Sequence, residues 1–253
     1  MSIRHVLRPL ESPHPFLIEE PCLRRNDQRD AGLHSPNNMW LPTRLFLKLF
    51  ARFDVRGLEN LPENGPLIFA ANHASEFDAV LLPAALPCFS SLAPIFYVAK
   101  EREFYGRNGF QALFYGGAFF KLWGAYPVRE GLKNYKLALS IHTQVLSEGK
   151  CVLIFPEGNI TPDGTLQPAH GGVAYLAWEA KAPVIPVAIQ GTFGLTPRDV
   201  FSGRRQITVS FGMSLDANCL FGQDQTKEPN VSTFKTAAES ILECNRSLHG
   251  AKE

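Results

Sequence analysis

The sequence predicts an α/β fold in which a largely parallel central sheet is flanked by helices. From Leu67 onward, short runs of β-branched or aromatic residues alternate with segments of helical periodicity, a pattern that is typical of parallel α/β layers. The chain has 253 residues, of which 45% are apolar and 19% are charged, so it can bury one substantial core. We therefore expect a single main domain that carries terminal extensions.

The expected elements follow in order along the chain. Residues 1–38 are rich in Pro, Asn and mixed charge without a sustained period, which predicts an N-terminal extension. The main domain is expected over 57–215, followed by a C-terminal helical extension over 216–253. Strands are predicted at 67–71, 95–99, 151–155, 184–190 and 206–211, and helices at 75–86, 109–122, 132–147, 171–181 and 233–248.

Residues 39–56 are predicted to contain a basic amphipathic helix, whose periodicity is clear over 39–53. Arg44, Lys48 and Arg52 recur every four residues, while apolar side chains cover the rest of the helix. A narrow basic stripe on an apolar helix is typical of a helix that lies beside anionic lipid head groups. A helix that packs on its own core and leaves its basic residues in water has the same pattern. The sequence leaves both interpretations open.

Composition excludes several classes of protein. A net charge of +1 gives no general attraction to nucleic acid. The five cysteines are scattered and include no Cys-x-x-Cys pair, which favours a reducing compartment over a disulfide framework or a zinc site. Pro83, Pro87 and Pro94 interrupt the longest uncharged run, 79–99, so a helix, a loop and a strand are expected there and not a membrane span. No signal peptide is evident. We expect a cytoplasmic protein that associates peripherally with a membrane.

The most informative stretch is Asn72-His73-x4-Asp78, at the end of the first predicted strand. Histidine can take a proton from a hydroxyl near neutral pH, and a carboxylate can fix its tautomer and stabilise the imidazolium. Ser75 and Asp78 also read as a capping box at the start of a helix, which needs no catalytic reason. The two interpretations are compatible, because an Asp in the first helical turn can reach back to a His in the preceding loop.

Three further sites lie close to predicted strands. Glu157, in Pro-Glu-Gly after the strand at 151–155, fits either a tight turn or a carboxylate that holds a hydroxyl. Arg129, in Gly124-Ala-Tyr-Pro-Val-Arg129, fits either a surface side chain or a clamp for an anion. Pro186 lacks an amide donor and predicts an edge, a bulge or a ligand-facing bend. His73, Lys100 and Glu157 all fall just after a predicted strand, where ligands collect in parallel sheets.

In their order along the chain, these blocks resemble the motifs of the glycerolipid acyltransferase family, the 1-acylglycerol-3-phosphate acyltransferase-like group. Its first block is similar to Asn72-His73-x4-Asp78 and its second to 124–129. Its third is similar to Phe155-Pro-Glu-Gly158 and its fourth to 185–187. The segment 98–101, with Lys100, resembles a short lysine-containing segment between the first two blocks. The resemblance covers about 57–213.

The resemblance implies a single catalytic domain that moves a fatty acyl group from acyl-coenzyme A or acyl carrier protein to a hydroxyl of a lysolipid or glycerol phosphate-type acceptor. It assigns His73 as general base and Asp78 as its orienter. It places Glu157, Arg129 and Lys100 at the acceptor site, with Gly158 keeping the turn open for substrate. A thioester is already activated, so one base suffices, and neither a cofactor nor a metal is expected.

One departure from the family concerns the third block. The family often continues it with Thr-Arg-Ser, whereas this chain reads Asn159-Ile160-Thr161. His170 also stands in a region where a lysine is common. Either Arg129, Lys100 or a distant arginine such as Arg198 compensates for the missing arginine, or the acceptor head group differs.

Two other functions are compatible with parts of the sequence. A thioester hydrolase would also use His and a carboxylate, but would activate water; the chain has no Gly-x-Ser-x-Gly elbow. A non-catalytic lipid-binding or membrane-adaptor protein would depend on the basic helix alone. Dependence of thioester consumption on an added lysolipid separates the first alternative from acyl transfer, and the effect of His73→Ala separates the second.

Overall fold

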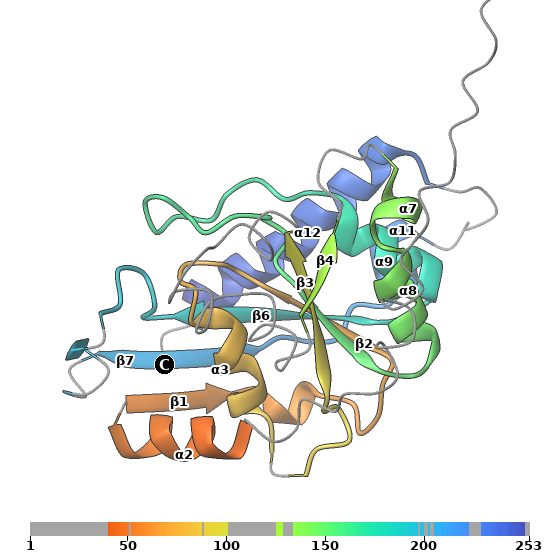
Figure 1. The fold of residues 1–253 in the computed structure, drawn as a ribbon. Helices are drawn as coiled ribbons and strands as arrows, with labels where there is room; N and C mark the ends of the chain where they lie inside the picture. Colours follow the sequence, from red (N-terminus) through yellow and green to blue (C-terminus); the bar gives the residue numbers. More distant parts are fainter. Residues whose placement is uncertain are drawn as a thin grey trace, which may run out of the picture. The chain divides into compact units, whose positions relative to one another are not determined.

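The computed structural model describes residues 40–50, 52–87, 89–100, 125–128, 134–196, 198–199, 202, 205–222 and 229–250 (Figure 1). All of these residues belong to one compact unit, which spans His34–Glu253. The predicted N-terminal extension, the predicted helix at 109–122 and Arg129 lie outside the described residues.

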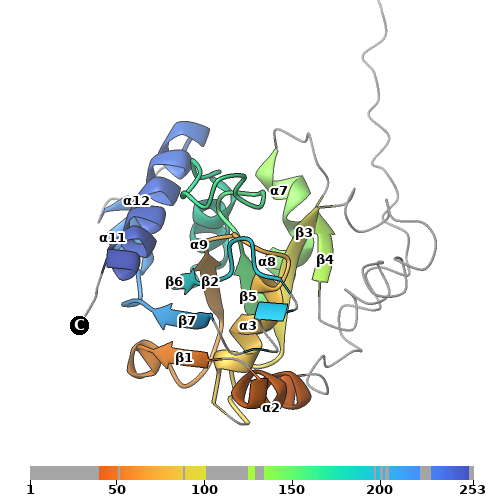
Figure 2. The same ribbon diagram turned by 90° about the vertical axis from the view of Figure 1, so that its left-hand side faces the viewer.

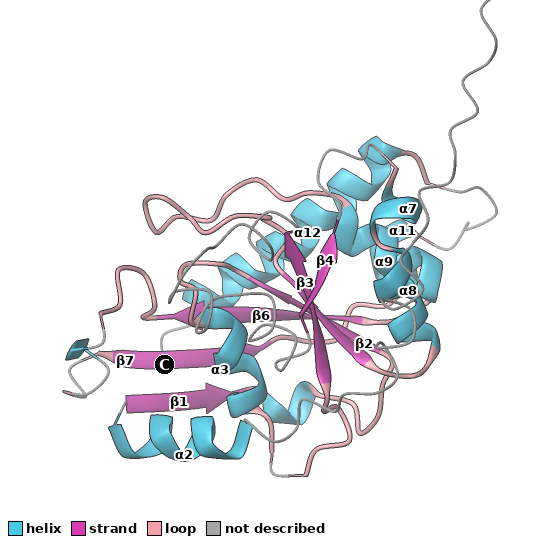
Figure 3. Cartoon of the chain, viewed as in Figure 1, coloured by secondary structure: helices cyan, strands magenta, loops and turns pink. Residues whose placement is uncertain are grey.

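The described residues build a seven-stranded sheet with the order β1-β7-β6-β2-β5-β3-β4 (Figure 3). Only the β6–β7 pair is antiparallel, so the predicted, largely parallel sheet is confirmed. The strands are β1 Arg52–Arg56, β2 Leu67–Ala71, β3 Ile95–Lys100, β4 Ala125–Val128, β5 Cys151–Ile154, β6 Val184–Gln190 and β7 Gln206–Phe211.

Helices cover both faces of the sheet. The described helices are α2 Trp40–Phe50, the 3-10 turn η2 Leu58–Asn60, α3 Asp78–Ala85, α7 Tyr135–Ala138, α8 Ser140–Ser147, α9 Gly172–Ala180, α11 Ala217–Phe221 and α12 Val231–Gly250. Side chains of α2 and α3 enter one hydrophobic cluster, and those of α8, α9 and α12 enter the other (Figure 2). The predicted arrangement of a sheet flanked by helices is therefore confirmed.

The central strand β2 divides its side chains between these two clusters. Leu67, Phe69 and Ala71 enter the cluster shared with α2 and α3, whereas Ile68 and Ala70 enter the cluster shared with α8, α9 and α12. Alternate residues of a strand point to opposite faces. Because both faces are covered, a polar residue has no place on either side, and all five residues are fully buried.

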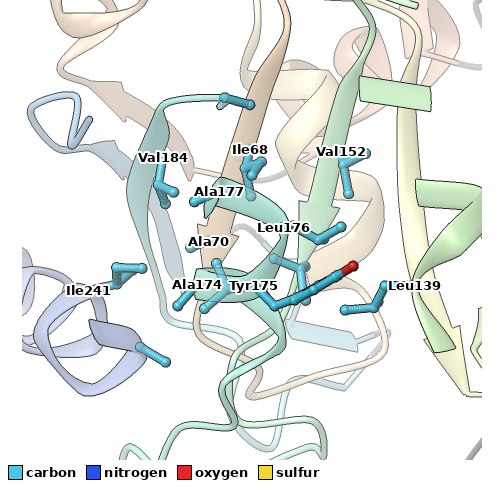
Figure 4. Packing of buried hydrophobic residues seen from close by; sticks show 14 of the residues in the cluster. Ile68, Ala70, Leu139, Val152, Ala174, Tyr175, Leu176, Ala177, Val184 and Ile241 are labelled. Carbon is cyan, nitrogen blue, oxygen red and sulfur yellow. The ribbon is translucent and has the colours of Figure 1, made fainter. Parts of the chain in front are cut away.

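Small residues allow α9 to lie close to the sheet. Figure 4 shows Ala174 and Ala177 of α9 over Ile68 and Ala70 of β2, with Ile241 of α12 beside them. Full burial of a side chain such as Ile241 stabilises the fold by about 1.5–3 kcal/mol. The sequence suggested that 216–253 is an extension of the domain. In the structure, buried side chains of α12 belong to one of the two hydrophobic clusters of the domain.

Two strands were not predicted. The helix predicted over 39–53 ends at Phe50, and Arg52 begins β1, which pairs with β7. Arg52 therefore does not continue the helical stripe of Arg44 and Lys48. The second unpredicted strand is β4, which pairs with β3 at the opposite edge of the sheet.

Helix boundaries also differ from the prediction. The helix expected from Ser75 begins at Asp78, with Phe77 as its N-cap, so Ser75 does not start the helix. The helix expected over 132–147 is divided at Leu139 into α7 and α8. Residues 79–99 form most of α3, a loop and most of β3, as predicted. None of the described helices is both long enough and apolar enough to cross a bilayer.

Pro186 lies in the interior of the sheet and not on an edge strand, because β6 is flanked by β2 and β7. The antiparallel register of β6 and β7 begins at Val187, directly after the proline. The carbonyl of Pro186 accepts the amide of Gly212 at 2.8 Å. The proline therefore lies directly before the stretch of β6 that pairs with β7, beside the carboxyl end of β7.

Candidate active site

Three central strands end together at the carboxyl edge of the sheet. β2 is paired in parallel with β5 on one side and with β6 on the other. The loop that follows β2 carries His73, and the turn that follows β5 carries Phe155 and Glu157. Two of the predicted blocks, far apart in the sequence, therefore meet at this edge.

His73 and Asp78 form the predicted pair. Nδ1 of His73 lies 3.0 Å from Oδ2 of Asp78. The same oxygen accepts the main-chain amides of Ala74 at 2.6 Å and Ser75 at 2.7 Å. Asp78 is fully buried, and the His73 side chain is 16% exposed. A carboxylate at Nδ1 favours the tautomer with hydrogen there, which leaves a lone pair on Nε2.

Phe155 packs against the face of the His73 imidazole. The two rings are stacked, with centroids 3.9 Å apart and planes inclined by 10°. The Phe155 ring restricts tilting of the His73 ring, while Asp78 restricts its rotation. Nε2 therefore has one defined direction before any substrate arrives, which is what a general base requires.

Glu157 holds the main chain on both sides of the site. Its Oε1 accepts the amide of His73 at 2.8 Å, and its Oε2 accepts the amide of Gln167 at 2.6 Å. Burial raises the pKa of the Glu157 carboxyl, although the two amides act in the opposite direction. The carboxylate predicted to contact the acyl acceptor thus also positions the backbone that carries the histidine.

Gly158 makes room for a side chain of the protein itself. Its φ is +71°, in the left-handed region, and a Cβ there would lie 2.9 Å from Cδ2 of His170. The family resemblance implies that this glycine keeps the turn open for substrate, which stays a prediction. In the structure the His170 ring lies against that position, and the glycine is required for the turn and for this contact.

Asn72 extends the sheet by one step with its side chain. The parallel register of β2 and β6 ends at Ala71 and Val187. Beyond it, Oδ1 of Asn72 accepts the amide of Ile189 at 2.7 Å, and Nδ2 donates to the Ile189 carbonyl at 3.0 Å. Asn72 is buried, so these bonds hold the start of the His73 loop against β6.

The side chains of two predicted site residues, Lys100 and Arg129, lie outside the part of the chain that the structure describes. Lys100 ends β3, where its main chain pairs with Val128 of β4. Arg129 follows β4 directly and lies outside the described residues. Among the described residues, no three His, Cys, Asp or Glu side chains lie close enough together to hold a metal ion.

A cavity of about 360 Å³ lies beside the His73 loop. Asn72, Ala74 and Glu157 line it on the side of the sheet. The loop at 161–166 and the end of α12, with Arg246 and His249, complete the lining. The cavity therefore includes both sequence neighbours of His73, although the imidazole itself is not among its lining groups.

Sequence reasoning missed three residues of this region. Asn72 and Phe155 belong to the motifs, but their bonding and stacking depend on tertiary contacts that local sequence does not show. Arg246 lies 174 positions beyond Asn72 in the sequence and has no motif around it. Only the packing of α12 on β6 and β2 places it at the cavity.

Comparison with known proteins agrees with this architecture. A family model described as Acyltransferase matches residues 52–190, more than half of the chain. A Bacillus subtilis protein named 1-acyl-sn-glycerol-3-phosphate acyltransferase is 30% identical over 149 residues, which cover 58% of this chain and 67% of that protein. A chloroplastic Brassica napus protein of the same name is 25% identical over 186 residues, which cover 73% of this chain and 48% of that protein.

A solved structure gives a further match. The 1-acyl-sn-glycerophosphate acyltransferase PlsC from Thermotoga maritima aligns with a TM-score of 0.56 over 92% of this chain and 86% of that chain, at 20% identity, which shows a shared fold. The matched residues make up 48% of the Brassica napus protein and 53% of an Ovis aries protein named 1-acyl-sn-glycerol-3-phosphate acyltransferase alpha, so the chain spans about half the length of these relatives. The family model and the bacterial relative show that the chain belongs to the acyltransferase family, in the 1-acyl-sn-glycerol-3-phosphate acyltransferase-like group.

Proposed function

We propose that the protein transfers an acyl group from a thioester donor to a hydroxyl of a glycerol phosphate-type acceptor, such as a lysophospholipid. The observation that carries this proposal is the contact of His73 with Asp78 at the carboxyl edge of the sheet. The proposal is supported by relatives named 1-acyl-sn-glycerol-3-phosphate acyltransferase. The donor would be acyl-coenzyme A or acyl carrier protein.

The reaction needs two proton transfers, one to His73 from the acceptor hydroxyl and one from His73 to the leaving thiolate. Nε2 of His73 takes the hydrogen of the acceptor hydroxyl while its oxygen attacks the thioester carbonyl. Asp78 stabilises the imidazolium that forms. The tetrahedral intermediate then expels the thiolate, which takes the proton back from the imidazolium and leaves as the thiol. One ester bond forms and one thioester bond breaks, with no covalent enzyme intermediate.

The test is a thiol-release assay on the full chain with and without lysophosphatidate, using each donor in turn. Release that requires lysophosphatidate and yields phosphatidate supports acyl transfer, whereas release at full rate without an acyl acceptor indicates a hydrolase. His73→Ala should lower the rate at least about 10²-fold, the low end for a lost general base. A folded His73→Ala protein with wild-type turnover would contradict the assignment.

We also propose peripheral association with a membrane through α2. Leu47 is buried, but Leu45 is 57% exposed and Leu49 is 67% exposed, with the exposed Lys48 between them. Arg44 instead donates to the carbonyl of Leu86. Two apolar side chains beside a cation support contact with an anionic lipid surface.

We place this surface on the cytoplasmic side of the membrane. The described cysteines, Cys151, Cys219 and Cys244, are free thiols, as is usual in a reducing compartment. A thiol-accessibility measurement on intact and on opened cells tests the side: labelling of the exposed Cys219 only after the membrane is opened supports it.

A further inference from the structure

The cavity beside the His73 loop has one permanent positive charge among its described lining residues. That charge is the guanidinium of Arg246, because burial lowers the pKa of the neighbouring His249. The loop that forms the other wall, 159–168, contains no Lys or Arg. Among the described residues, α12 therefore supplies the countercharge for an anion bound in this cavity.

The position of Arg246 is fixed by contacts on both sides of it in α12. Nδ2 of Asn245, which is fully buried, donates to the carbonyl of Ala70 in β2 at 3.1 Å. One turn later, the carbonyl of His249 accepts from Nε2 of Gln190, at the end of β6, at 3.1 Å. The two bonds join α12 to the two strands that end at the site, so Arg246 is held at the cavity.

The lining of the cavity has a carboxylate on one side and a guanidinium on the other. Glu157 enters from the end of β5, and each of its oxygens already accepts one main-chain amide. Arg246 enters from α12 and can donate two parallel hydrogen bonds to a phosphate. The volume, about 360 Å³, lies within the range of about 300–1,000 Å³ for small-molecule sites.

We propose that this cavity binds the phosphate of the acyl acceptor's glycerol phosphate head group, with Arg246 as its partner. The inference rests on the proposed function and adds to it a residue that selects for the phosphate. Arg246 forms an exposed ion pair with Glu243 on its own helix. Exposed pairs of this kind contribute little, and a phosphate dianion replaces the Glu243 carboxylate as the better partner.

Steady-state kinetics of Arg246→Ala test the proposal. The KM for lysophosphatidate should rise about tenfold, the effect of losing a hydrogen bond to a charged group, while kcat and the KM for the acyl donor stay close to wild type. For monoacylglycerol, which lacks the phosphate, the same variant should behave as wild type. Lys235→Ala, which removes an exposed cation from the same helix away from the cavity, is the matched control. An unchanged KM for lysophosphatidate in Arg246→Ala, or an equal rise in Lys235→Ala, overturns the proposal.

Calorimetry separates this inference from the proposed reaction. Wild-type protein should bind sn-glycerol 3-phosphate more tightly than inorganic phosphate or glycerol, and Arg246→Ala should lose that preference. If the wild type binds glycerol 3-phosphate in this way but forms no ester, the proposed reaction fails and the site stands. If the wild type forms the ester, but Arg246→Ala changes neither the binding of glycerol 3-phosphate nor the KM for lysophosphatidate, the proposed site is wrong and the proposed reaction stands. Equal binding of all three ligands by the wild type also overturns the site.

Discussion

Oδ2 of Asp78 lies 3.0 Å from Nδ1 of His73 and accepts, at the same time, the amides of Ala74 and Ser75. The main chain therefore fixes the carboxylate, and the imidazole orients on a partner that is already in place. Because Asp78 begins α3, its backbone position is set by the helix. Such preorganisation lowers the reorganisation needed when the imidazole takes a proton.

Asp78→Asn should separate the negative charge of the carboxylate from its role in folding. An amide oxygen in the place of Oδ2 can still accept from Ala74, Ser75 and Nδ1 of His73, so the ring keeps its orientation, while the charge that stabilises the imidazolium is lost. We expect kcat to fall by about 10²–10⁴-fold, as in other sites where a base loses its carboxylate partner, with little change in melting temperature. Wild-type kcat in a folded Asp78→Asn protein contradicts this role.

Asn72→Ala should destabilise the protein, because it leaves the buried amide and carbonyl of Ile189 without their partner. At about 1–3 kcal/mol for each of these two unsatisfied buried groups, we expect a loss of roughly 2–6 kcal/mol in urea unfolding. Asn60→Ala is the control, since Asn60 makes a single, partly buried bond to the carbonyl of Phe211. Equal losses in the two variants would argue against the bridging role of Asn72.

Local sequence was sufficient where burial on both faces left a continuous apolar run. β2 and β6 are such runs and have the predicted bounds. β7 also has its predicted bounds, but there the signal was the alternation of apolar residues with Thr208 and Ser210. The contact between His73 and Asp78 was also predictable, because a residue at a strand end and another in the first turn of the next helix are separated by a short loop. Both predictions depend on residues that are close in the sequence and are therefore necessarily close in the structure.

Local sequence was insufficient where pairing or packing joins distant segments. β1 reads Arg-Phe-Asp-Val-Arg, and its first arginine continues the four-residue spacing of the preceding helix, so the helical interpretation extended too far. The segment forms a strand because it pairs with β7, which lies more than 150 positions away in the sequence. In the same way, only the fold brings His170 against Gly158 and Arg246 to the cavity beside Glu157.

The buried carboxyl of Glu157 should give a measurable dependence of stability on pH. Burial raises its pKa above the ordinary value of 4.5, so the folded protein keeps this proton to a higher pH than the unfolded chain does. The free energy of unfolding then falls as the pH rises from the ordinary pKa to the folded one, and this contribution is level above it. Glu157→Gln cannot titrate at this position. The free energy of unfolding of the wild type minus that of the variant, measured in urea, should therefore fall from pH 4 to pH 7. A difference that grows over this range would mean that the folded pKa is lowered.

The exposed leucines of α2 should determine binding to vesicles. Replacing Leu45 and Leu49 together by Ser should weaken binding to phosphatidylglycerol vesicles at least about tenfold, since each buried leucine contributes about 1.5–3 kcal/mol. Lys48→Ala should cost about 1 kcal/mol, and only at low salt. Leu137→Ser is the control, because Leu137 is 62% exposed but lies on α7. If this control weakens binding as much, or the α2 variant binds as wild type, α2 is not the lipid-facing surface.

Gly158→Ala should destabilise the protein more than Gly149→Ala does. Both glycines have positive φ, +71° and +76°, but a Cβ at Gly149 meets nothing within 4 Å, whereas one at Gly158 lies 2.9 Å from the His170 ring. The left-handed conformation alone costs about 1–2 kcal/mol for a non-glycine residue, and this cost is common to both variants. The excess at Gly158 measures the contact with His170.

A double-mutant cycle isolates that contact. In a His170→Ala background the cost of Gly158→Ala should fall to that of Gly149→Ala, because the ring is gone and only the backbone cost remains. Urea unfolding of the four proteins of the cycle, with Gly149→Ala as reference, gives the comparison. If Gly158→Ala costs the same with and without the His170 ring, then the ring moves aside freely, and the turn requires glycine for its backbone conformation alone.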